Sequence, residues 1–278
     1  MRTELISIPT DSAPLDGVMY TPDTEPATNS ALYFHGNTMN FYVGAARFLP
    51  AVLTRMGLVF VAFNRRGHDI LSTRNSRIAE GGAFQSTAQA IEDNRIAARW
   101  LAERGHRAPV IIGHSNGGML GTRHVVDHPQ TPALVLLSAG RGGVRQDTSG
   151  GSENLFAGDR LAELTAQAQT LVAEGRGREL MLMPGWWYVI SAESFLDRIV
   201  SVPDTIALAP HITCPILAIR GDKEDRDRYP AEEFQAAAGG SCAVNIVQDC
   251  DHFYNSREAH VAGIVADWLA QTLGLARR

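Results

Sequence analysis

The sequence predicts an α/β protein in which a mostly parallel central sheet carries helices on both of its faces. Short runs of apolar, often β-branched residues alternate with longer segments of helical periodicity, which is the pattern of repeated βαβ units. Several of these runs are apolar at every position, as expected for strands that are buried on both faces. The 278 residues, of which 45% are hydrophobic, suffice for one large domain with an inserted segment.

The first half of the chain provides a hairpin and the first buried strands. The expected strands are residues 4–8, 15–20, 31–34 and 58–63. A helix is expected over residues 45–56, ended by Gly57, and a second one over residues 87–104, ended by Gly105. The strand at residues 31–34 runs into a His-Gly pair, which places a glycine loop at the end of that strand.

A serine stands at the turn between the next strand and its helix. Residues 110–112 are Val-Ile-Ile, residues 113–117 read Gly-His-Ser-Asn-Gly, and a helix is expected over residues 119–126. In a G-x-S-x-G pattern at such a turn, the serine adopts a strained backbone conformation and its hydroxyl is held above the sheet edge. The flanking glycines lack the Cβ atoms that would clash with neighbouring backbone. The context therefore favours a nucleophilic serine, Ser115, over an ordinary strand–helix turn.

After an expected strand at residues 133–138 the alternation stops. A glycine-rich stretch comes first, and no apolar strand of the same quality occurs before residue 213. Residues 159–174 form an amphipathic helix with its apolar stripe at Leu161, Leu164, Ala168, Leu171 and Val172. A shorter helix is expected near residues 194–200. Because this segment is too long for one crossover helix, we predict a helical cap, or lid, inserted over the carboxyl edge of the sheet. The predicted division is residues 1–138 and 206–278 for the core and 139–205 for the cap.

Large side chains gather beside a Pro-Gly turn of the expected cap. They are Met181, Met183, Trp186, Trp187 and Tyr188. A turn at this point presents large rings to a cleft, which makes Trp186, Trp187 and Tyr188 candidates for substrate binding. The alternative role is packing, in which the same side chains attach the cap to the core.

The alternation resumes towards the end of the chain. Strands are expected at residues 215–219 and 243–247, with a helix at 231–238 between them. The closing helix carries apolar residues at helical spacing, namely Val261, Ile264, Val265, Trp268 and Leu269. Acidic residues directly follow the first of these strands, and His252 follows the second.

Composition excludes several classes of function. The net charge of −5 and the absence of a basic run argue against nucleic acid or an anionic membrane as a partner. No apolar run is long enough for a signal peptide or a membrane span, so a cytoplasmic protein is expected. Three scattered cysteines do not make a disulfide framework or a zinc site, and Cys250, close to His252, is expected to be buried and structural. No metal or cofactor is expected, because the histidines lack metal-ligand spacing and no phosphate-binding glycine loop is present.

The order of the candidate residues is serine, then an acidic cluster, then histidine. A serine hydroxyl is a poor nucleophile near neutral pH, so a base must take its proton as it attacks. An imidazole, with a usual pKa of ~6.5, suits this task. A carboxylate on the other ring nitrogen orients the imidazole, and backbone N–H groups stabilise the oxyanion that forms.

At this point the chain resembles an α/β-hydrolase-fold serine hydrolase of the esterase and lactonase branch. The matching segments are His35-Gly36-Asn37, residues 64–68, residues 113–117, residues 220–224 and Asp251-His252-Phe253. The resemblance implies that Ser115 is the nucleophile and His252 the base. It also implies that the backbone N–H groups of Asn37 and Asn116 form the oxyanion hole. His35 and His114 flank this site and are expected to pack or to orient loops.

The acid has three candidates, which are Asp222, Glu224 and Asp225. All three lie in the first turn beyond Gly221. In similar hydrolases the acid stands three positions after such a glycine, which here is Glu224, although the usual residue is aspartate. A one-residue insertion in the loop would move the role to Asp225, whereas Asp222 is better placed to stabilise the turn. We expect Glu224 to be the acid, because glutamate is an accepted triad acid in this fold.

The expected activity is hydrolysis of a small-molecule carboxylic ester or lactone through an acyl-enzyme. An acyltransferase or a hydrolase of C–C bonds would use the same triad. A dehalogenase or epoxide hydrolase is excluded, because it would need a carboxylate where Ser115 stands. A non-catalytic binding protein on this fold is the third alternative, since fold alone does not decide function. Retention of His252 argues against it.

Overall fold

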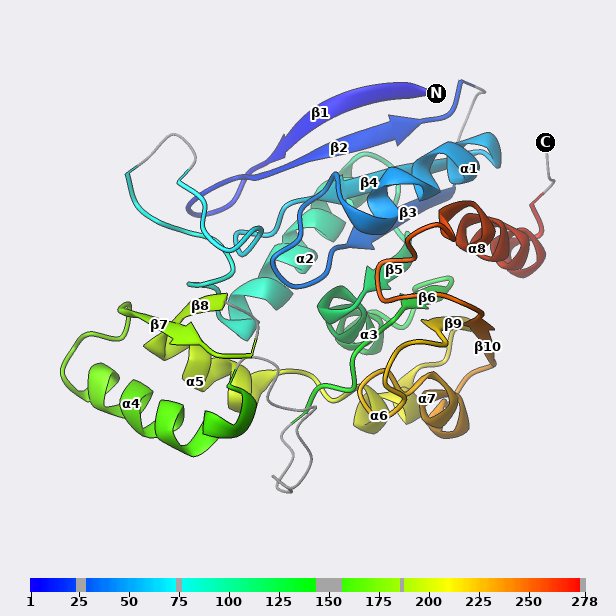
Figure 1. The fold of residues 1–278 in the computed structure, drawn as a ribbon. Coiled ribbons are helices and arrows are strands. Elements are labelled where there is room, and N and C mark those ends of the chain that lie inside the picture. The colour runs from blue at the N-terminus through cyan, green and yellow to red at the C-terminus, as the bar shows by residue number, and fades with distance from the viewer. Residues whose placement is uncertain (24–28, 74–76, 144–156, 186–187, 276–278) are drawn as a thin grey trace.

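The computed structural model describes residues 1–23, 29–73, 77–143, 157–185 and 188–275. Their main feature is one eight-stranded sheet with the strand order β1-β2-β4-β3-β5-β6-β9-β10 (Figure 1). The strands are β1 (Arg2–Ile8), β2 (Leu15–Thr21), β3 (Asn29–Phe34), β4 (Leu58–Phe63), β5 (Val110–His114), β6 (Leu134–Leu137), β9 (Ile216–Gly221) and β10 (Cys242–Val247). The expected fold class, including the hairpin of β1 and β2, is confirmed.

The strands that carry the candidate site are parallel. Only the hairpin departs from this direction, because β2 pairs antiparallel with both β1 and β4. From β4 across the sheet to β10 every pair is parallel. His114 pairs with Leu137, and Leu137 pairs with Ile219. The carboxyl ends of β5, β6 and β9 therefore lie level with one another at one edge of the sheet.

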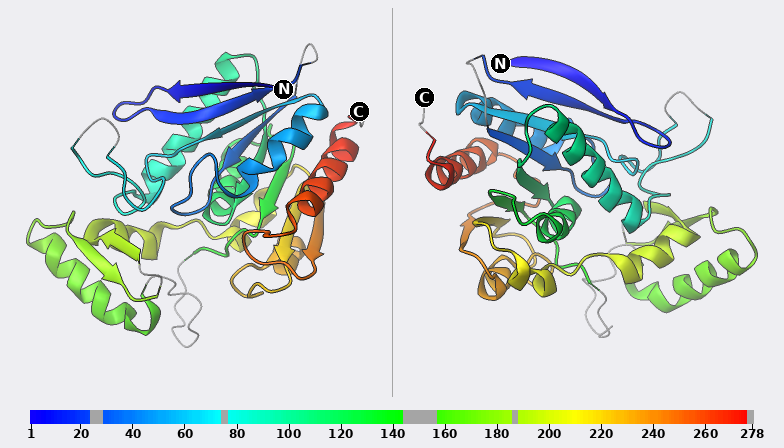
Figure 2. Two further views of the ribbon diagram at one scale, coloured as in Figure 1. Left: turned by 45° about the horizontal axis from the view of Figure 1, so that its top comes forward. Right: turned by 180° about the vertical axis from the view of Figure 1, so that it is seen from behind.

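Helices cover both faces of this sheet (Figure 2). The helices α1 (Leu49–Arg55) and α8 (Glu258–Leu273) pack on one face, and α2 (Thr87–Glu103), α3 (Asn116–Asp127) and α7 (Ala231–Ala237) on the other. Successive strand residues alternate between the two cores, so that Tyr33 belongs to the first and Leu32 to the second. Two buried cores on one sheet explain why the strands are apolar throughout.

The expected helix over residues 45–56 is interrupted. A 3₁₀ turn, Gly44–Arg47, comes first, and α1 begins only at Leu49. The cause is Pro50, which lacks an N–H donor and is tolerated only in the first turn of a helix. No helix in the described ranges is both long and apolar enough to cross a bilayer.

The segment between β6 and β9 contains a second, smaller structural unit. It consists of α4 (Leu161–Ala173), the antiparallel strands β7 (Leu180–Met183) and β8 (Tyr188–Ser191), and α5 (Ala192–Ser201). We call residues 157–201 the cap segment. It has its own hydrophobic cluster, separate from the two cores of the main sheet. A short helix, α6 (Thr205–Leu208), follows it and leads back to the sheet.

The strands β7 and β8 were not predicted from the sequence. Each has only four residues, and in β7 exposed residues alternate with buried ones, so neither resembles the fully apolar strands of the main sheet. Met181 and Met183 are buried in the cluster of the cap segment, where they pack against α4 and α5. The expected stripe of α4 was wrong at Val172, which is 42% exposed. The predicted boundaries at residues 139 and 205 remain predictions.

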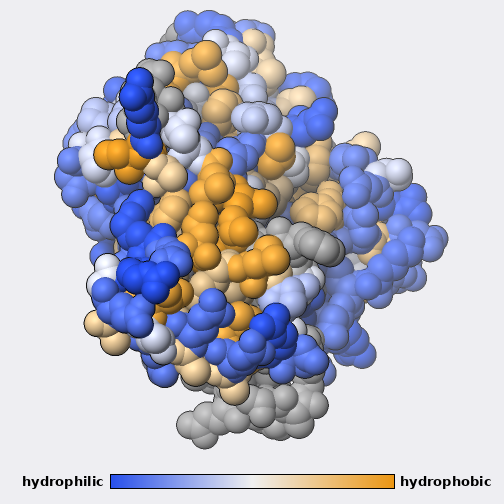
Figure 3. Space-filling view, turned by 60° about the vertical axis from the view of Figure 1, so that its left-hand side comes forward, coloured by the Kyte–Doolittle hydropathy of each residue, from blue (hydrophilic) through white to orange (hydrophobic). Residues whose placement is uncertain are grey.

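The cap segment lies beside the loop between β4 and α2. The N–H of Ser191 donates to the carbonyl of Ala83 at 2.8 Å, and Arg178 donates to the carbonyl of Ala79 at 3.1 Å. Exposed hydrophobic side chains occur in both segments, including Ile78 in the loop and Leu182 in β7. The view that brings this side of the molecule forward shows hydrophobic residues gathered among hydrophilic ones (Figure 3).

Candidate active site

Ser115 lies at the sharp turn between β5 and α3. Its backbone has φ 55° and ψ −120°, a conformation that is strained for any residue with a side chain. Its N–H donates to the carbonyl of Leu137 at 2.9 Å, which ties the turn to the neighbouring strand. A Cβ on Gly113 would lie 2.3 Å from the carbonyl oxygen of Gly117, and one on Gly117 would lie 2.0 Å from that of Phe34. Both glycines of the pattern are therefore required by close backbone contact.

The loop after β3 reaches the same place. A Cβ on Gly36 would lie 3.3 Å from the Cβ of Ser115, so this loop passes directly beside the serine. Asn116 is the first residue of α3, where backbone N–H groups have no partner within the helix. Among the residues that the structure describes, neither the Asn37 N–H nor the Asn116 N–H donates to a backbone carbonyl. Two donors thus flank Ser115.

A buried arginine and a histidine fix the loop after β3. The N–H of Arg65 donates to Nε2 of His35 at 3.1 Å, which leaves the ring proton on Nδ1, and Nδ1 donates to the carbonyl of Gly36 at 2.8 Å. Nη2 of Arg65 donates to the carbonyl of His35 at 2.6 Å. Burial and the nearby Arg65 hold the pKa of His35 well below its usual value, and burial lowers the pKa of Arg65 to about 10. His35 is therefore neutral, as the assigned tautomer requires.

His252 and Glu224 are in direct contact. Nδ1 of His252 lies 2.7 Å from Oε1 of Glu224, and the carboxylate is almost completely buried. The other oxygen, Oε2, accepts from the N–H of Gly221 at 2.7 Å and from the hydroxyl of Ser138 at 2.6 Å. Because the only proton of Ser138 goes to the carboxylate, the Tyr254 hydroxyl, 2.7 Å away, is the donor to Ser138. The carboxylate thus has one oxygen fully occupied and the other directed at the histidine.

The other two acid candidates bind backbone groups instead. Asp222 accepts from the N–H of Cys250 at 3.0 Å, and Asp225 accepts from the N–H groups of Asp227 and Arg228 at 2.8 and 2.9 Å. Both side chains stabilise loop backbone, as expected for Asp222. Of the three candidates, Glu224 is the one that the structure places against His252.

Two rings enclose the imidazole of His252. The ring centroids of His114 and Tyr229 lie 4.9 and 4.7 Å from that of His252, with interplanar angles of 33° and 35°. Nε2 of His114 donates to the carbonyl of His252 at 2.9 Å. Burial and the neighbouring His252 lower the pKa of His114 to about 3, so His114 stays neutral near physiological pH. It therefore packs and orients, as the sequence analysis expected.

The structure brings Ser115, Glu224 and His252 to one edge of the sheet, each beyond the end of a different strand. Within the described residues no hydrogen bond joins Oγ of Ser115 to His252. Such contacts are often long in the absence of substrate and tighten when it binds. The arrangement places a hydroxyl, an imidazole with a buried carboxylate partner and two N–H donors at one edge of the sheet.

The three predicted substrate-binding residues lie wholly or partly outside the described part of the chain. Trp186 and Trp187 lie outside the described residues, and so does the side chain of Tyr188. Ser138 and Tyr254, which hold Glu224, were not predicted, although Ser138 stands at a strand end like the other site residues.

In the part of the chain described, no group of acidic, histidine or cysteine side chains could hold a metal ion. Cys250 is buried, as expected, and burial raises its thiol pKa to about 11, so the thiol is not ionised at neutral pH.

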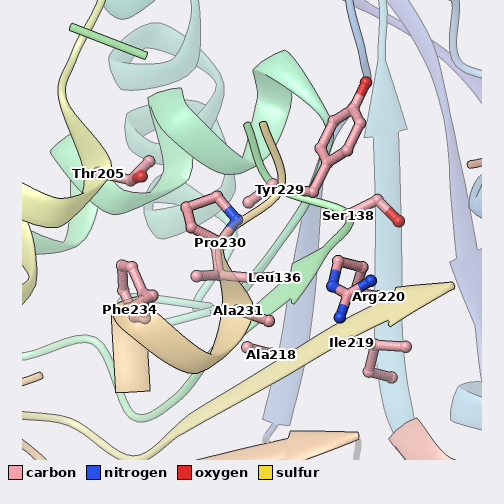
Figure 4. Close-up of a pocket in the computed structure, with 11 residues that line it drawn as sticks. Leu136, Ser138, Thr205, Ala218, Ile219, Arg220, Tyr229, Pro230, Ala231 and Phe234 are labelled. Carbon is pink, nitrogen blue, oxygen red and sulfur yellow. The ribbon is translucent and has the colours of Figure 1, made fainter. Parts of the chain in front are cut away.

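A small pocket is lined in part by Ser138, the residue that donates to Glu224, and Ser115 is not among its lining residues (Figure 4). Side chains of β6, β9 and the start of α7 form most of its wall, among them Leu136, Ala218 and Phe234. Ser138 and Tyr229 belong both to this wall and to the surroundings of Glu224 and His252. The pocket thus borders the side of the site that faces α7.

Buried neutral histidines predict loss of stability in mild acid. Burial is the main cause that lowers the pKa of His114 and of His124 to about 3 and that of His35 well below its usual value. The unfolded chain binds these protons below pH ~6.5 while the folded chain does not, so each group lowers stability by up to about 1.4 kcal/mol per pH unit as the pH falls. Urea unfolding at pH 7, 6 and 5 measures this slope.

The variant that tests this is His124→Leu, because His124 lies near the far end of α3, the helix whose first residue follows Ser115. This variant is expected to show a slope that is smaller by about 1.4 kcal/mol per pH unit. A free energy of unfolding that does not change between pH 7 and pH 5 would contradict the expectation.

Comparison with known proteins finds a matching family profile and solved structures of similar fold. The sequence profile of the alpha/beta hydrolase family matches residues 31–266. A carboxyl esterase from Bacillus coagulans in complex with glycerol is 15% identical with a TM-score of 0.72, over 98% of this chain and 99% of that one. Est1E from Butyrivibrio proteoclasticus with bound ferulic acid is 16% identical with a TM-score of 0.69, over 97% and 99%. The dienelactone hydrolase of Anabaena variabilis is 16% identical with a TM-score of 0.60, over 97% of each chain. None of the curated proteins compared with the chain matches it.

Proposed function

The chain belongs to the alpha/beta hydrolase family, and from that premise we propose that it is a serine hydrolase that cleaves a carboxylic ester or lactone through an acyl-enzyme. The observation that carries the proposal is the buried Glu224 carboxylate, 2.7 Å from Nδ1 of His252, at the strand edge that also bears the strained turn of Ser115. A serine held in this way next to a histidine with an acidic partner has the parts that acyl transfer needs.

The proposed reaction proceeds in two halves. Oγ of Ser115 attacks the carbonyl carbon while Nε2 of His252 takes the hydroxyl proton, and the carbonyl oxygen becomes an oxyanion that accepts from the N–H groups of Asn37 and Asn116. Collapse of this intermediate breaks the ester bond, and His252 gives the proton to the departing alcohol. Water then attacks the acyl-enzyme while His252 takes a proton from it. The second intermediate collapses as His252 returns this proton to Oγ, which releases the acid and restores Ser115. Glu224 accepts a hydrogen bond from the Nδ1 proton of His252 throughout. Nε2 of His252 therefore carries no proton at the start and can accept the proton of Ser115.

The preference for esters and lactones rests on the relatives. The structures that resemble this chain include a carboxyl esterase, a protein that binds ferulic acid and a dienelactone hydrolase. Acyl transfer to an acceptor other than water, or C–C hydrolysis, would use the same residues and would appear as products other than a free acid and an alcohol.

The test is labelling with a fluorophosphonate probe followed by peptide mass spectrometry. We expect one modified residue, Ser115, and no labelling after heat denaturation. Turnover of a panel of p-nitrophenyl esters and simple lactones then identifies the acyl group. A native protein that the probe leaves unlabelled, and that turns over no member of the panel, would refute the proposal and favour a binding protein on this fold.

A further inference from the structure

The helix α5 of the cap segment contacts the core through two neighbouring side chains. Asp197 accepts from the N–H of Thr87, the first residue of α2, at 2.6 Å. Nη2 of Arg198 donates to the carbonyl of Gly82 at 2.8 Å. The first contact binds the cap segment to the start of α2, and the second binds it to the loop that precedes α2. They attach the cap to the core without touching the residues around Ser115.

Arg198 makes a further contact that Asp197 does not. Its Nη1 donates to Oδ1 of Asn37 at 2.6 Å. Asn37 directly follows Gly36, where an added Cβ would lie 3.3 Å from the Cβ of Ser115. The side-chain nitrogen Nδ2 of Asn37 is buried without a hydrogen bond among the described residues, so Arg198 supplies the side-chain contact that the structure shows for Asn37. One guanidinium therefore joins the cap helix to the loop beside the serine.

The peptide between Gly36 and Asn37 is held on its carbonyl side by other groups. The Gly36 carbonyl accepts from Nδ1 of His35 at 2.8 Å and from the N–H of Met39 at 3.3 Å. In a planar trans peptide the N–H points opposite to the carbonyl, so these bonds also set the line along which the Asn37 N–H points. These bonds hold one end of the peptide, and Arg198 binds the Asn37 side chain at the other end, so the position of the N–H depends on both sets of contacts.

We propose that Arg198 is a positioning residue of the oxyanion hole: by binding the Asn37 side chain, it makes the geometry of the Asn37 N–H depend on docking of the cap segment. This rests on the proposed function, because it assigns the Asn37 N–H to the oxyanion. An oxyanion donor is worth about 10²- to 10³-fold in kcat when it is correctly placed. Arg198 therefore affects the chemical step from the cap without touching the reacting atoms.

The experiment compares Arg198→Met with Asp197→Ala, a matched control on the same helix that removes the acceptor of the Thr87 N–H but leaves Asn37 bound. Kinetics on the best p-nitrophenyl ester and inhibition by a boronic acid, which mimics the tetrahedral intermediate, are measured for each. We expect Arg198→Met to lower kcat by roughly 10- to 100-fold, part of what a whole donor supplies. The affinity for the boronic acid should fall in parallel, with KM changed less than about threefold. Asp197→Ala should keep kcat within about threefold.

A double-mutant cycle separates this role from others. Asn37→Ala removes the side chain that Arg198 holds but keeps the backbone N–H, so it should lower kcat about as much as Arg198→Met. The double variant should be no worse than either single one, because both remove the same contact. Equal losses from Arg198→Met and Asp197→Ala would assign Arg198 to docking alone. A change confined to KM would assign it to substrate binding, and either result overturns the proposal. If the wild-type protein is not labelled by fluorophosphonate, the proposed function fails first, independently of Arg198.

Discussion

Replacing Ser115 with alanine is expected to lower kcat by roughly 10⁴- to 10⁶-fold, the range seen when a triad nucleophile is removed. The large effect follows from the chemistry, since without Oγ no acyl-enzyme can form and only the oxyanion donors remain. The substitution removes one atom from a half-buried side chain and leaves the backbone contact of Ser115 with Leu137 in place. Steady-state kinetics on an activated ester measure the loss of kcat.

Thermal unfolding of Ser115→Ala shows whether the fold is retained, and we expect a melting temperature within a few degrees of the wild-type value. Ser7→Ala, in the edge strand β1 with three strands between it and β5, is the matched serine control and should keep full activity. A Ser115→Ala variant that hydrolyses a good ester at nearly the wild-type rate would rule out this serine as nucleophile.

The second large effect is expected for Glu224→Gln, which should lower kcat by up to roughly 10⁴-fold. The reason lies in the two oxygens of Glu224. Oε2 receives hydrogen bonds from the Gly221 N–H and the Ser138 hydroxyl, so the amide oxygen of a glutamine must occupy that place. The amide NH₂ then faces Nδ1 of His252 and donates to it. His252 would carry its proton on Nε2, the atom that has to accept the proton of Ser115.

The same substitution at the other two acids is the control. Asp222→Asn and Asp225→Asn keep a side-chain oxygen for the backbone N–H groups that these residues bind, and we expect kcat within about tenfold of wild type. Steady-state kinetics of the three variants on one ester decide between them. A larger loss at Asp222 or Asp225 than at Glu224 would move the role of the acid to that residue.

The fold was predictable because buried parallel strands have a strong sequence pattern. The strand 58–63 is apolar at every position, and the structure places it inside the sheet with both faces covered. The pattern failed where burial is one-sided and elements are short. In β7, Leu180 and Leu182 are exposed while Met181 and Met183 are buried in the cap segment, and four residues are too few for a periodicity to be recognised.

The candidate site was predictable only as far as chain order and motif spacing reach. These placed Ser115, Glu224 and His252 at strand ends, but they could not show which of three acids meets the histidine. That choice depends on the hydrogen bonds of Asp222 and Asp225 to nearby backbone and on the length of the Glu224 side chain. Contacts such as Arg198 with Asn37 join residues 161 positions apart and leave no local pattern in the sequence.

The backbone of Ser115 has a consequence for any attempt to improve this protein by directed evolution. A φ of 55° with a ψ of −120° costs a side-chain-bearing residue about 1–3 kcal/mol, a sizeable share of the 5–15 kcal/mol that stabilises a typical domain. Glycine adopts such angles readily. A library screened for heat resistance alone would therefore enrich glycine at position 115, and the most durable clones would be those without the proposed nucleophile. Heat selection has to be paired with an activity screen in every round.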